Sequence, residues 1–320
     1  MSLPRIRYGD IEAELGTDDT VLTVLVREGV EVPNACRAGH CHACLVRGDD
    51  PPPAAQRGLK PTLVQQGYFL ACQARPERDL CVHAQEAVRT VRTKVTELQR
   101  LGDDILRLRL RPDAPIEYTP GQFIQVIHPT GVARSYSLAS LPAEGALELH
   151  VRRVEGGLVS TWMHDVVEVG QPIEVRGPFG ACYYVEDDLD QPLLLSGAGT
   201  GLAPLWGIVR DALEHGHRGP MHLIQGALDS SRLYLVDELR RLADAVPQLT
   251  VHLCALRGER EGVRLDPLDA LTVEVGGALE SPRAFLCGAP DLVRRLQRGL
   301  FLAGVSSKDI LSDPFMPAET

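Results

Sequence analysis

The sequence lacks any hydrophobic run that could cross a membrane. Its longest apolar stretch, Pro192–Val209, contains four glycines and two prolines, whereas a spanning helix needs about 20 predominantly apolar residues in a row. The first ten residues alternate charged and apolar side chains, which is not the pattern of a signal peptide. We therefore expect a cytoplasmic protein that does not enter a membrane.

An excess of positive charge is also lacking. The chain has 33 basic and 43 acidic residues, for a formal net charge of -10, and a nucleic-acid-binding protein needs a basic face to neutralise phosphates. Lysine is scarce, with three residues beside thirty arginines, and we draw no function from that bias. Small molecules and other proteins are the expected partners, not nucleic acid.

The composition gives no sign of general disorder. Hydrophobic residues make up 44% and charged residues 24% of the 320 residues, which is close to the average of globular proteins. A chain of this length is expected to form two or three domains, each with its own core.

Eight cysteines are present, and four of them are grouped. Cys36, Cys41 and Cys44 form a C-x4-C-x2-C run, and Cys72 follows 28 positions later. In a reducing compartment, clustered thiols bind metal more often than they form disulfides. This spacing is typical of the plant-type [2Fe-2S] cluster, in which one loop wraps the cluster and a distant segment closes it.

Two other metal centres are less consistent with these cysteines. A zinc site made of four cysteines usually has two C-x2-C pairs, and Cys72 has no such partner. His40 and His42 could suggest a Rieske-type centre, but there histidines replace two of the cysteines, and all four are present here. We expect both histidines to be exposed loop residues. Cys81, Cys182 and Cys254 are interpreted as small buried residues.

The local pattern of the first 84 residues is mixed. Arg5–Leu15 alternates like a hairpin, and Thr20–Glu28 has helical spacing after a cap formed by Asp18 and Asp19. Pro51–Pro53 indicates a loop. This arrangement around the cysteines resembles a plant-type ferredoxin domain with a β-grasp fold.

From Thr90 onward the sequence reads as a set of strands. Val91–Leu98, Ile105–Leu110, Phe123–Ile127 and Leu147–Val151 alternate with period two and are separated by turn residues. A small antiparallel β-barrel is the expected construction.

Two polar segments lie among these strands. They resemble the flavin domain of the ferredoxin-NADP reductase superfamily, and the resemblance assigns their roles: Arg134 offers a planar fork to a pyrophosphate, Tyr136 a ring that can stack on a flavin, and Ser137 a hydroxyl for a flavin nitrogen. Further along, Gly157 and Ser160 resemble the second flavin motif, where a helix N-terminus receives a diphosphate, and this favours FAD over FMN. The glycine pair at 156–157 could also be an ordinary turn.

The remainder, from about residue 189, alternates strands and helices. A glycine-rich turn follows a hydrophobic strand and precedes a helix expected at Leu205–Glu214, and further strands are expected at Met221–Gly226, Leu249–Ala255 and Ala284–Cys287. Leu202 stands where a Rossmann fingerprint has its third glycine. The pattern predicts a doubly wound parallel α/β domain.

Taken in order, these segments resemble the ferredoxin-NADP reductase superfamily, and in particular the NADH:acceptor reductase components of bacterial multicomponent oxygenases. The resemblance implies a plant-type [2Fe-2S] ferredoxin domain at 1–84, an FAD-binding β-barrel at 90–188 and an NAD(P)-binding domain at 189–320. The fold class is thus multidomain, with a β-grasp, an antiparallel barrel and a doubly wound parallel sheet.

The resemblance also assigns roles to residues. It makes Cys36, Cys41, Cys44 and Cys72 the cluster ligands, and Ser137, Thr200 and Cys287 the catalytic residues around the flavin and the nicotinamide. Standing alone, Cys287 could equally be a buried small residue at a strand end. The residues implied in cofactor binding are Arg134, Tyr136, Ser137, Val151, Gly157, Ser160, Gly197, Gly199, Thr200, Gly201, Asp229, Cys287, Gly288 and Phe315.

The choice of coenzyme depends on the segment after the second strand of the last domain. Asp229 could accept a hydrogen bond from a ribose hydroxyl and would repel a 2′-phosphate, whereas Arg232 could do the reverse. The domain order resembles NADH-using reductases, so NADH is expected rather than NADPH. Phe315 stands where relatives often carry an aromatic that covers the flavin, although five residues follow it.

The implied activity is electron transfer from NADH through FAD and a [2Fe-2S] cluster to a partner protein. The expected acceptor is the hydroxylase component of a mono- or dioxygenase, and the free protein is expected to be a monomer. A separate ferredoxin or a deoxysugar dehydratase could be the acceptor instead. A redox-sensing module without turnover is the alternative of a different class.

Overall fold

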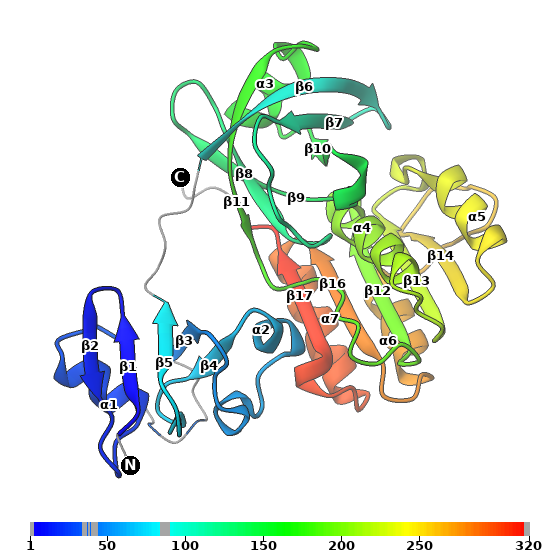
Figure 1. Ribbon diagram of the computed structural model, residues 1–320. Helices are drawn as coiled ribbons and strands as arrows, with labels where there is room; N and C mark the ends of the chain where they lie inside the picture. Colours follow the sequence, from blue (N-terminus) through cyan, green and yellow to red (C-terminus); the bar gives the residue numbers. More distant parts are fainter. Residues whose placement is uncertain (1–2, 34–36, 38, 40–43, 84–89, 317–320) are drawn as a thin grey trace. The chain divides into compact units, whose positions relative to one another are not determined.

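The computed structural model describes residues 3–33, 37, 39, 44–83 and 90–316. The chain forms two compact units, Met1–Ala87 and Val88–Thr320, and each is described by itself (Figure 1). Of the helices in the described residues, none is both long and apolar enough to span a membrane.

The first unit is a mixed five-stranded sheet in the order β2-β1-β5-β3-β4. β1 pairs with β2 antiparallel and with β5 parallel, which confirms the predicted hairpin. Val24, Leu25 and Phe69 lie in a core between this sheet and the first helix. The elements are β1 (Arg5–Tyr8), β2 (Ile11–Glu14), α1 (Val21–Arg27), β3 (Leu45–Gly48), η1 (Pro53–Gln56), α2 (Pro61–Gln65), β4 (Tyr68–Leu70) and β5 (Leu80–His83).

The predicted cap of α1 was wrong. Thr20 is the N-cap: its hydroxyl accepts from the Thr23 amide at 3.2 Å, and the Thr23 hydroxyl accepts from the Thr20 amide at 2.6 Å. Asp19 instead accepts from the Gly16 amide and pairs with Arg27 at 2.9 Å. The Asp19 carboxylate is thus engaged by Gly16 and by Arg27 in the last turn of α1, and a hydroxyl one residue later satisfies the first turn.

The first half of the second unit is a six-stranded antiparallel sheet in the order β10-β7-β6-β11-β8-β9. A bridge between Leu138 and Leu149 joins its two ends, so the sheet closes as the predicted barrel. Leu108, Val126 and Ile173 fill its interior. The elements are β6 (Thr90–Arg100), β7 (Ile105–Pro112), β8 (Phe123–Ile127), β9 (Ala133–Ser137), η2 (Pro142–Glu144), β10 (Leu147–Arg152), α3 (Leu158–Asp165) and β11 (Pro172–Phe179).

The second half is a six-stranded parallel sheet in the order β15-β14-β13-β12-β16-β17. Leu205 on α4 and Leu239 on α5 pack on one face, and Leu271 on α6 and Leu296 on α7 pack on the other. The doubly wound prediction is confirmed.

The bounds of this half extend the predicted elements. The helix after the glycine-rich turn begins at Leu202, three residues before the expected start at Leu205. The elements are β12 (Leu193–Ala198), η3 (Gly199–Gly201), α4 (Leu202–Glu214), β13 (Met221–Ala227), η4 (Ser230–Arg232), α5 (Val236–Ala245), β14 (Leu249–Ala255), β15 (Val263–Arg264), α6 (Leu268–Gly277), β16 (Arg283–Gly288), α7 (Pro290–Leu302), η5 (Ser307–Asp309) and β17 (Ile310–Pro314).

Candidate functional site

The glycine-rich turn lies at the carboxyl edge of the parallel sheet, where α/β proteins bind their ligands. A Cβ atom at Gly201 would lie 2.4 Å from the Cys287 carbonyl oxygen, and one at Gly197 would lie 2.9 Å from the same atom. Gly199 has a φ of 55°, in the left-handed region. Only glycines let the turn approach β16 this closely, and Thr200 is half-exposed within the turn.

An acidic residue that the sequence did not single out completes this edge. Ser137, at the end of β9, donates its hydroxyl to the Asp313 carboxylate at 2.9 Å. Asp313 lies on β17 opposite Cys287 on β16. Burial raises the pKa of Asp313, and the hydrogen bond from Ser137 offsets part of that effect. The barrel and the parallel sheet therefore meet at a serine, a carboxyl and a thiol.

The thiol at this junction is fully buried. Burial and the neighbouring thiol of Cys182 raise the pKa of Cys287 well above its ordinary value, so the thiol is protonated at neutral pH. Gly288 and Phe315 lie beside it, because the Phe315 amide donates to the Gly288 carbonyl at 2.8 Å. A neutral thiol next to a carboxyl group is an apolar, uncharged wall for a bound ring.

The other residues expected to bind flavin lie on the barrel. Arg134 is exposed on β9 with its guanidinium 2.7 Å from the Ala133 carbonyl, and Tyr136 on the same strand is half-buried. Burial raises the pKa of Tyr136, so its phenol stays neutral. Val151 is fully buried, and its carbonyl accepts from His164 at 2.9 Å.

The turn before α3 has the form that a diphosphate site requires. Gly157 is the N-cap, and a Cβ there would lie 2.7 Å from the Ser160 hydroxyl. That hydroxyl accepts from the Val154 amide at 3.2 Å, which closes the turn. The first-turn amides of α3 lack acceptors within the helix and so can donate to an anion.

Two of the four predicted cluster ligands lie within the described residues. Cys44 precedes β3 and Cys72 follows β4; both are buried, and their thiols hydrogen-bond to each other. The Gln73 side-chain amide lies 3.5 Å from the Cys72 sulfur. Burial raises the pKa of the Cys44 thiol. Cys36 and Cys41, with His40 and His42, lie outside the described residues.

Of the remaining cysteines, Cys182 and Cys254 are buried as expected, with 2% and 1% of their surface exposed. The same interpretation was wrong for Cys81, which is half-exposed on β5. Its side chain lies on a small sheet whose opposite face carries the core, so burial is incomplete.

The coenzyme-selecting segment follows β13. Asp229 caps η4 by accepting from the Ser231 amide and hydroxyl at 3.1 and 2.8 Å, and it pairs with Arg257 at 3.2 Å. The Ser231 hydrogen bonds and Arg257 lower the pKa of Asp229. Arg232 turns elsewhere, with its guanidinium 3.9 Å from Asp104. Asp229 is thus the acidic group held in place at this strand end.

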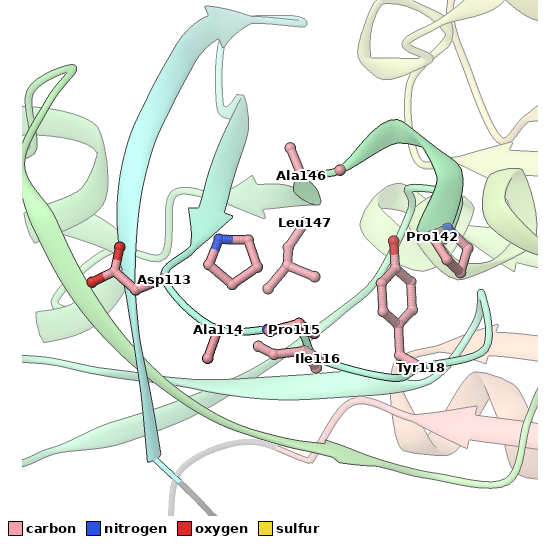
Figure 2. A pocket seen from close by; sticks show the side chains of 10 residues that line it. Asp113, Ala114, Pro115, Ile116, Tyr118, Pro142, Ala146 and Leu147 are labelled. Atoms are coloured by element: carbon pink, nitrogen blue, oxygen red, sulfur yellow. The ribbon is translucent and has the colours of Figure 1, made fainter.

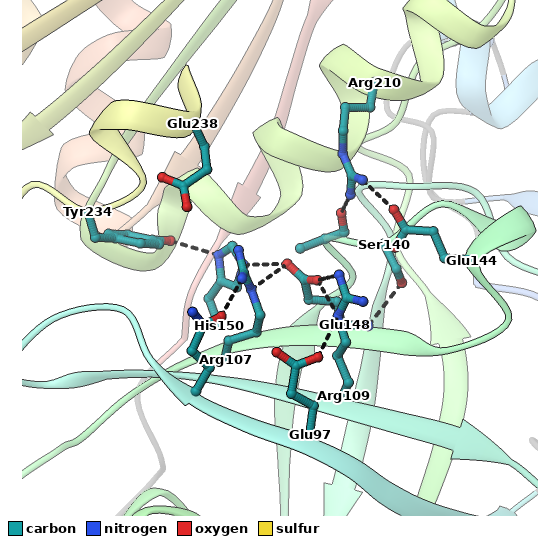
Figure 3. A network of polar contacts seen from close by, with 12 residues as sticks. Glu97, Arg107, Arg109, Ser140, Glu144, Glu148, His150, Arg210, Tyr234 and Glu238 are labelled. Atoms are coloured by element: carbon teal, nitrogen blue, oxygen red, sulfur yellow. Dashed lines mark hydrogen bonds and ion pairs between the residues drawn. The ribbon is translucent and has the colours of Figure 1, made fainter. Parts of the chain in front are cut away.

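A buried ionic network links the barrel to the parallel sheet (Figure 3). Arg107 and Arg109 contact the Glu148 carboxylate at 3.2 and 2.6 Å, and His150 contacts it at 2.9 Å. The other ring nitrogen of His150 lies 3.0 Å from the Tyr234 hydroxyl, just before α5. Burial opposes ionisation of Glu148, but the histidine and arginines lower its pKa to about 2.

A separate hollow lies on the barrel (Figure 2). It has a volume of about 320 Å³, and Pro115, Ile116, Tyr118 and Leu147 contribute apolar surface to it. None of the residues expected to bind a cofactor lines it.

Three family models match the chain in sequence. The 2Fe-2S iron-sulfur cluster binding domain covers residues 7–77, the oxidoreductase FAD-binding domain covers 92–184, and the oxidoreductase NAD-binding domain covers 195–298. The reductase component of a naphthalene 1,2-dioxygenase system from Pseudomonas putida is 33% identical over 312 residues, which is 93% of each chain. The chain belongs to the reductase components of multicomponent oxygenases.

Other relatives of this reductase agree. The reductase subunit of an aromatic O-demethylase from Amycolatopsis is 31% identical over 98% of both chains. The crystal structure of a cytochrome P450 reductase from Amycolatopsis matches with a TM-score of 0.71 and 28% identity, over 99% of this chain and 100% of that one. The protein is therefore an NAD(P)H-dependent iron-sulfur flavoprotein with FAD and a [2Fe-2S] cluster.

The described residues of the reductase fit these cofactors. Two buried thiols in contact form half of a thiolate site, and an amide N–H next to one sulfur suits a cluster. The glycine turn packs closely against Cys287, and a Cβ at Gly199 would meet nothing within 4 Å, which suits the close approach of a dinucleotide to the turn. The capped turn at Gly157 offers free amides for a diphosphate.

Proposed function

We propose that this reductase takes electrons from NADH and delivers them to the oxygenase component of a multicomponent system. The support is the sequence similarity, over nearly the whole chain, to proteins named as reductase components of a naphthalene dioxygenase system, a toluate dioxygenase and a propane monooxygenase. When bound, FAD would accept two electrons as hydride and release them one at a time, and the cluster would pass single electrons to the acceptor.

In this proposal the flavin residues act by position. Arg134 and the turn at Gly157 and Ser160 hold the diphosphate, Tyr136 stacks on the flavin ring, and Val151 lines the site. The Ser137 hydroxyl donates its proton to the buried Asp313 carboxylate at 2.9 Å, so its oxygen would be the atom that Ser137 presents to the flavin nitrogen, held in place by Asp313. Asp313 is a positioning residue here because it acts through Ser137.

For the nicotinamide, we propose that Gly197, Gly199, Thr200 and Gly201 carry the dinucleotide across the sheet edge. Cys287 and Gly288 would form one side of the nicotinamide site, and Phe315 would cover the flavin. A fully buried thiol excludes water from the place where hydride leaves. We also propose Cys36, Cys41, Cys44 and Cys72 as the cluster ligands.

The domain limits are proposed at 1–84, 90–188 and 189–320. The three family models fall within these limits, and the break between the two compact units falls in the interval from 84 to 90.

The decisive experiment is an anaerobic titration of the purified protein with NADH, following the flavin and iron-sulfur absorbance together. Both bands should bleach as NADH is added, because the cofactors form one internal path. If neither bleaches while both cofactors are present, the nicotinamide site is wrong and a redox-sensing role without turnover replaces this proposal.

The acceptor is tested separately. One relative is named as a ferredoxin reductase component, so a separate ferredoxin is the second candidate. NADH-driven reduction of a purified oxygenase component, with and without a cognate ferredoxin, separates the two. Reduction only when the ferredoxin is present would favour the second candidate.

The coenzyme preference rests on Asp229. We expect kcat/KM for NADH to exceed that for NADPH, because a fixed carboxylate accepts from a ribose hydroxyl and repels a 2′-phosphate. Asp229→Ser should lower the ratio of kcat/KM for NADH to kcat/KM for NADPH at least tenfold, because Arg257 would then be free to pair with the 2′-phosphate of NADPH. Equal kcat/KM values for the two coenzymes in the parent protein would contradict the preference.

A further inference from the structure

Three chemically different side chains converge in the first unit, away from the predicted cluster ligands. Asp49 directly follows β3, and Cys81 and His83 lie on β5, which pairs with β3 so that Arg47 faces His83. The carboxylate oxygen of Asp49, the sulfur of Cys81 and a ring nitrogen of His83 all lie within 4.8 Å of one another. His83 Nε2 is 2.8 Å from Asp49 Oδ1.

We propose that Asp49, Cys81 and His83 form a binding site for a divalent cation of the zinc class. A thiolate, an imidazole and a carboxylate are the donors that zinc takes, and three protein ligands leave its fourth position to water. The thiolate and the carboxylate together balance the charge of the ion. Hard cations such as Mg²⁺ are excluded as the main occupant, because they prefer oxygen ligands throughout.

The spacing of the three atoms suits this ion. Ligand atoms held about 2.0 to 2.3 Å from a tetrahedral zinc lie roughly 3.3 to 3.8 Å from one another. The His83 and Asp49 atoms are closer than that because they hydrogen-bond directly at 2.8 Å. An ion between them would replace this hydrogen bond by moving the two side chains apart by less than 1 Å.

The surroundings supply the other parts of a metal site. The Arg7 guanidinium on β1 hydrogen-bonds to Cys81, which orients the sulfur. A polar hollow of about 610 Å³ reaches the site, and both Asp49 and His83 line it, so an ion can enter from solvent. The side chain of Asp49 is 70% exposed and that of His83 is 29% exposed. A hydrogen-bonded His–Asp pair on the surface does not need a thiol beside it, so the presence of Cys81 favours a metal site over a simple pair.

This site is separate from the cluster. Cys44 precedes β3 and Asp49 follows it, so the two lie at opposite ends of the strand, about 16 Å apart at the usual rise per residue. Binding of zinc is therefore not expected to displace iron. Because His83 ends β5 and Asp49 directly follows β3, the ion would link the two paired strands.

The test is calorimetric titration of the reduced holoprotein, containing FAD and the cluster, with ZnCl₂ after removal of loosely bound metal. We expect one high-affinity Zn²⁺ per chain. Cys81→Ser and His83→Gln should each weaken binding at least tenfold. The matched controls, Asp50→Asn next to the site and Cys254→Ala in the other unit, should bind as the parent does.

Iron content and the cluster absorbance are measured in the same samples. Unchanged iron with one Zn²⁺ bound supports the proposal. Two results would overturn it: Cys81→Ser binding Zn²⁺ with the affinity of the parent, or release of iron in step with zinc uptake. A Cys81→Ser protein that retains its cluster and FAD shows that lost zinc binding does not reflect misfolding.

Discussion

At the scale of single residues, Glu148 illustrates how a buried charge depends on its partners. Its side chain is 2% exposed, and Arg107, Arg109 and His150 surround the carboxylate. Replacing it by glutamine leaves the Arg107 guanidinium without this counter-charge and leaves Arg109 with only Glu97, at 3.8 Å. We expect Glu148→Gln to lower the free energy of unfolding by about 3 kcal/mol, at the lower end of the usual range because Arg109 is partly exposed to water. Chemical denaturation followed by flavin fluorescence measures this loss.

The control for that prediction is Glu97→Gln. Glu97 also pairs with Arg109, but at 3.8 Å and with 44% of its side chain exposed, so its loss should change stability by less than about 0.5 kcal/mol. The pKa of Glu148 is lowered from 4.5 to about 2. Its contribution is therefore complete above pH 4.5 and is lost as the pH falls toward 2. Equal losses in the two variants would contradict the network's role.

Asp211 on α4 gives the opposite sign of pH dependence. Burial raises the pKa of its carboxyl from 3.8 to about 6, although His215 opposes the shift. Between these pKa values the folded chain holds a proton that the unfolded chain has lost, so stability falls as the pH rises through this window. Asp211→Asn should therefore be more stable than the parent at pH 7, by about 1 to 3 kcal/mol, and no more stable near pH 4.

Unfolding midpoints of both proteins across pH 4 to 7 measure the Asp211 effect. Asp244→Asn, on the exposed side of α5, is the control and should leave the curve in place. If the stability of the parent instead rises steadily from pH 4 to 6 and does not differ from that of Asp211→Asn, then Asp211 ionises freely in the folded chain.

At the scale of elements, the sequence predicted regular strands better than the turns and helix starts next to them. Phe123–Ile127 and Leu249–Ala255 were predicted to the residue, because alternation and apolar runs follow directly from which faces are buried. Helix α4 began three residues early at Leu202, because the glycine turn passes through η3 straight into the helix. Local spacing does not reveal that continuity.

The proposed nicotinamide site at the edge of the parallel sheet was only partly predictable for a related reason. Ser137 and Cys287 were predicted from motifs, and that prediction stays untested, but Asp313 lies 176 positions after its partner Ser137. Their contact depends on β17 pairing in parallel beside β16 and on the barrel meeting that edge. Short five-residue strands at the end of a chain carry little periodic signal, so the sequence left Ile310–Phe315 without a firm role.

The glycine-rich turn yields a prediction at this scale. Gly201→Ala would place a Cβ 2.4 Å from the Cys287 carbonyl, which forces the turn or β16 to shift. Because misplacement by about 1 Å can cost two orders of magnitude in rate, NADH-dependent flavin reduction should slow at least tenfold with FAD still bound. Anaerobic stopped-flow absorbance measures the rate. Gly102→Ala, whose Cβ would meet nothing within 4 Å, should react as the parent does.

At the scale of the whole molecule, the chain separates two tasks between two units. The FAD and NAD family models both fall within Val88–Thr320, and the iron-sulfur model falls within Met1–Ala87. The network around Glu148 and the contact of Ser137 with Asp313 join the barrel and the parallel sheet inside the larger unit. Reaction with NADH is therefore expected to need only that unit.

This division predicts the behaviour of a fragment containing Val88–Thr320. The fragment should bind FAD and reduce ferricyanide with NADH at a rate within about threefold of the full chain, because its cores and the proposed nicotinamide site are complete. It should lose NADH-driven reduction of cytochrome c, which depends on the cluster.

Full-length Cys72→Ser is the matched control, since it retains the first unit without an intact set of ligands. It should likewise reduce ferricyanide but not cytochrome c. A fragment that cannot hold FAD, or a Cys72→Ser protein that reduces cytochrome c normally, would show that the two tasks are not divided between the units in this way.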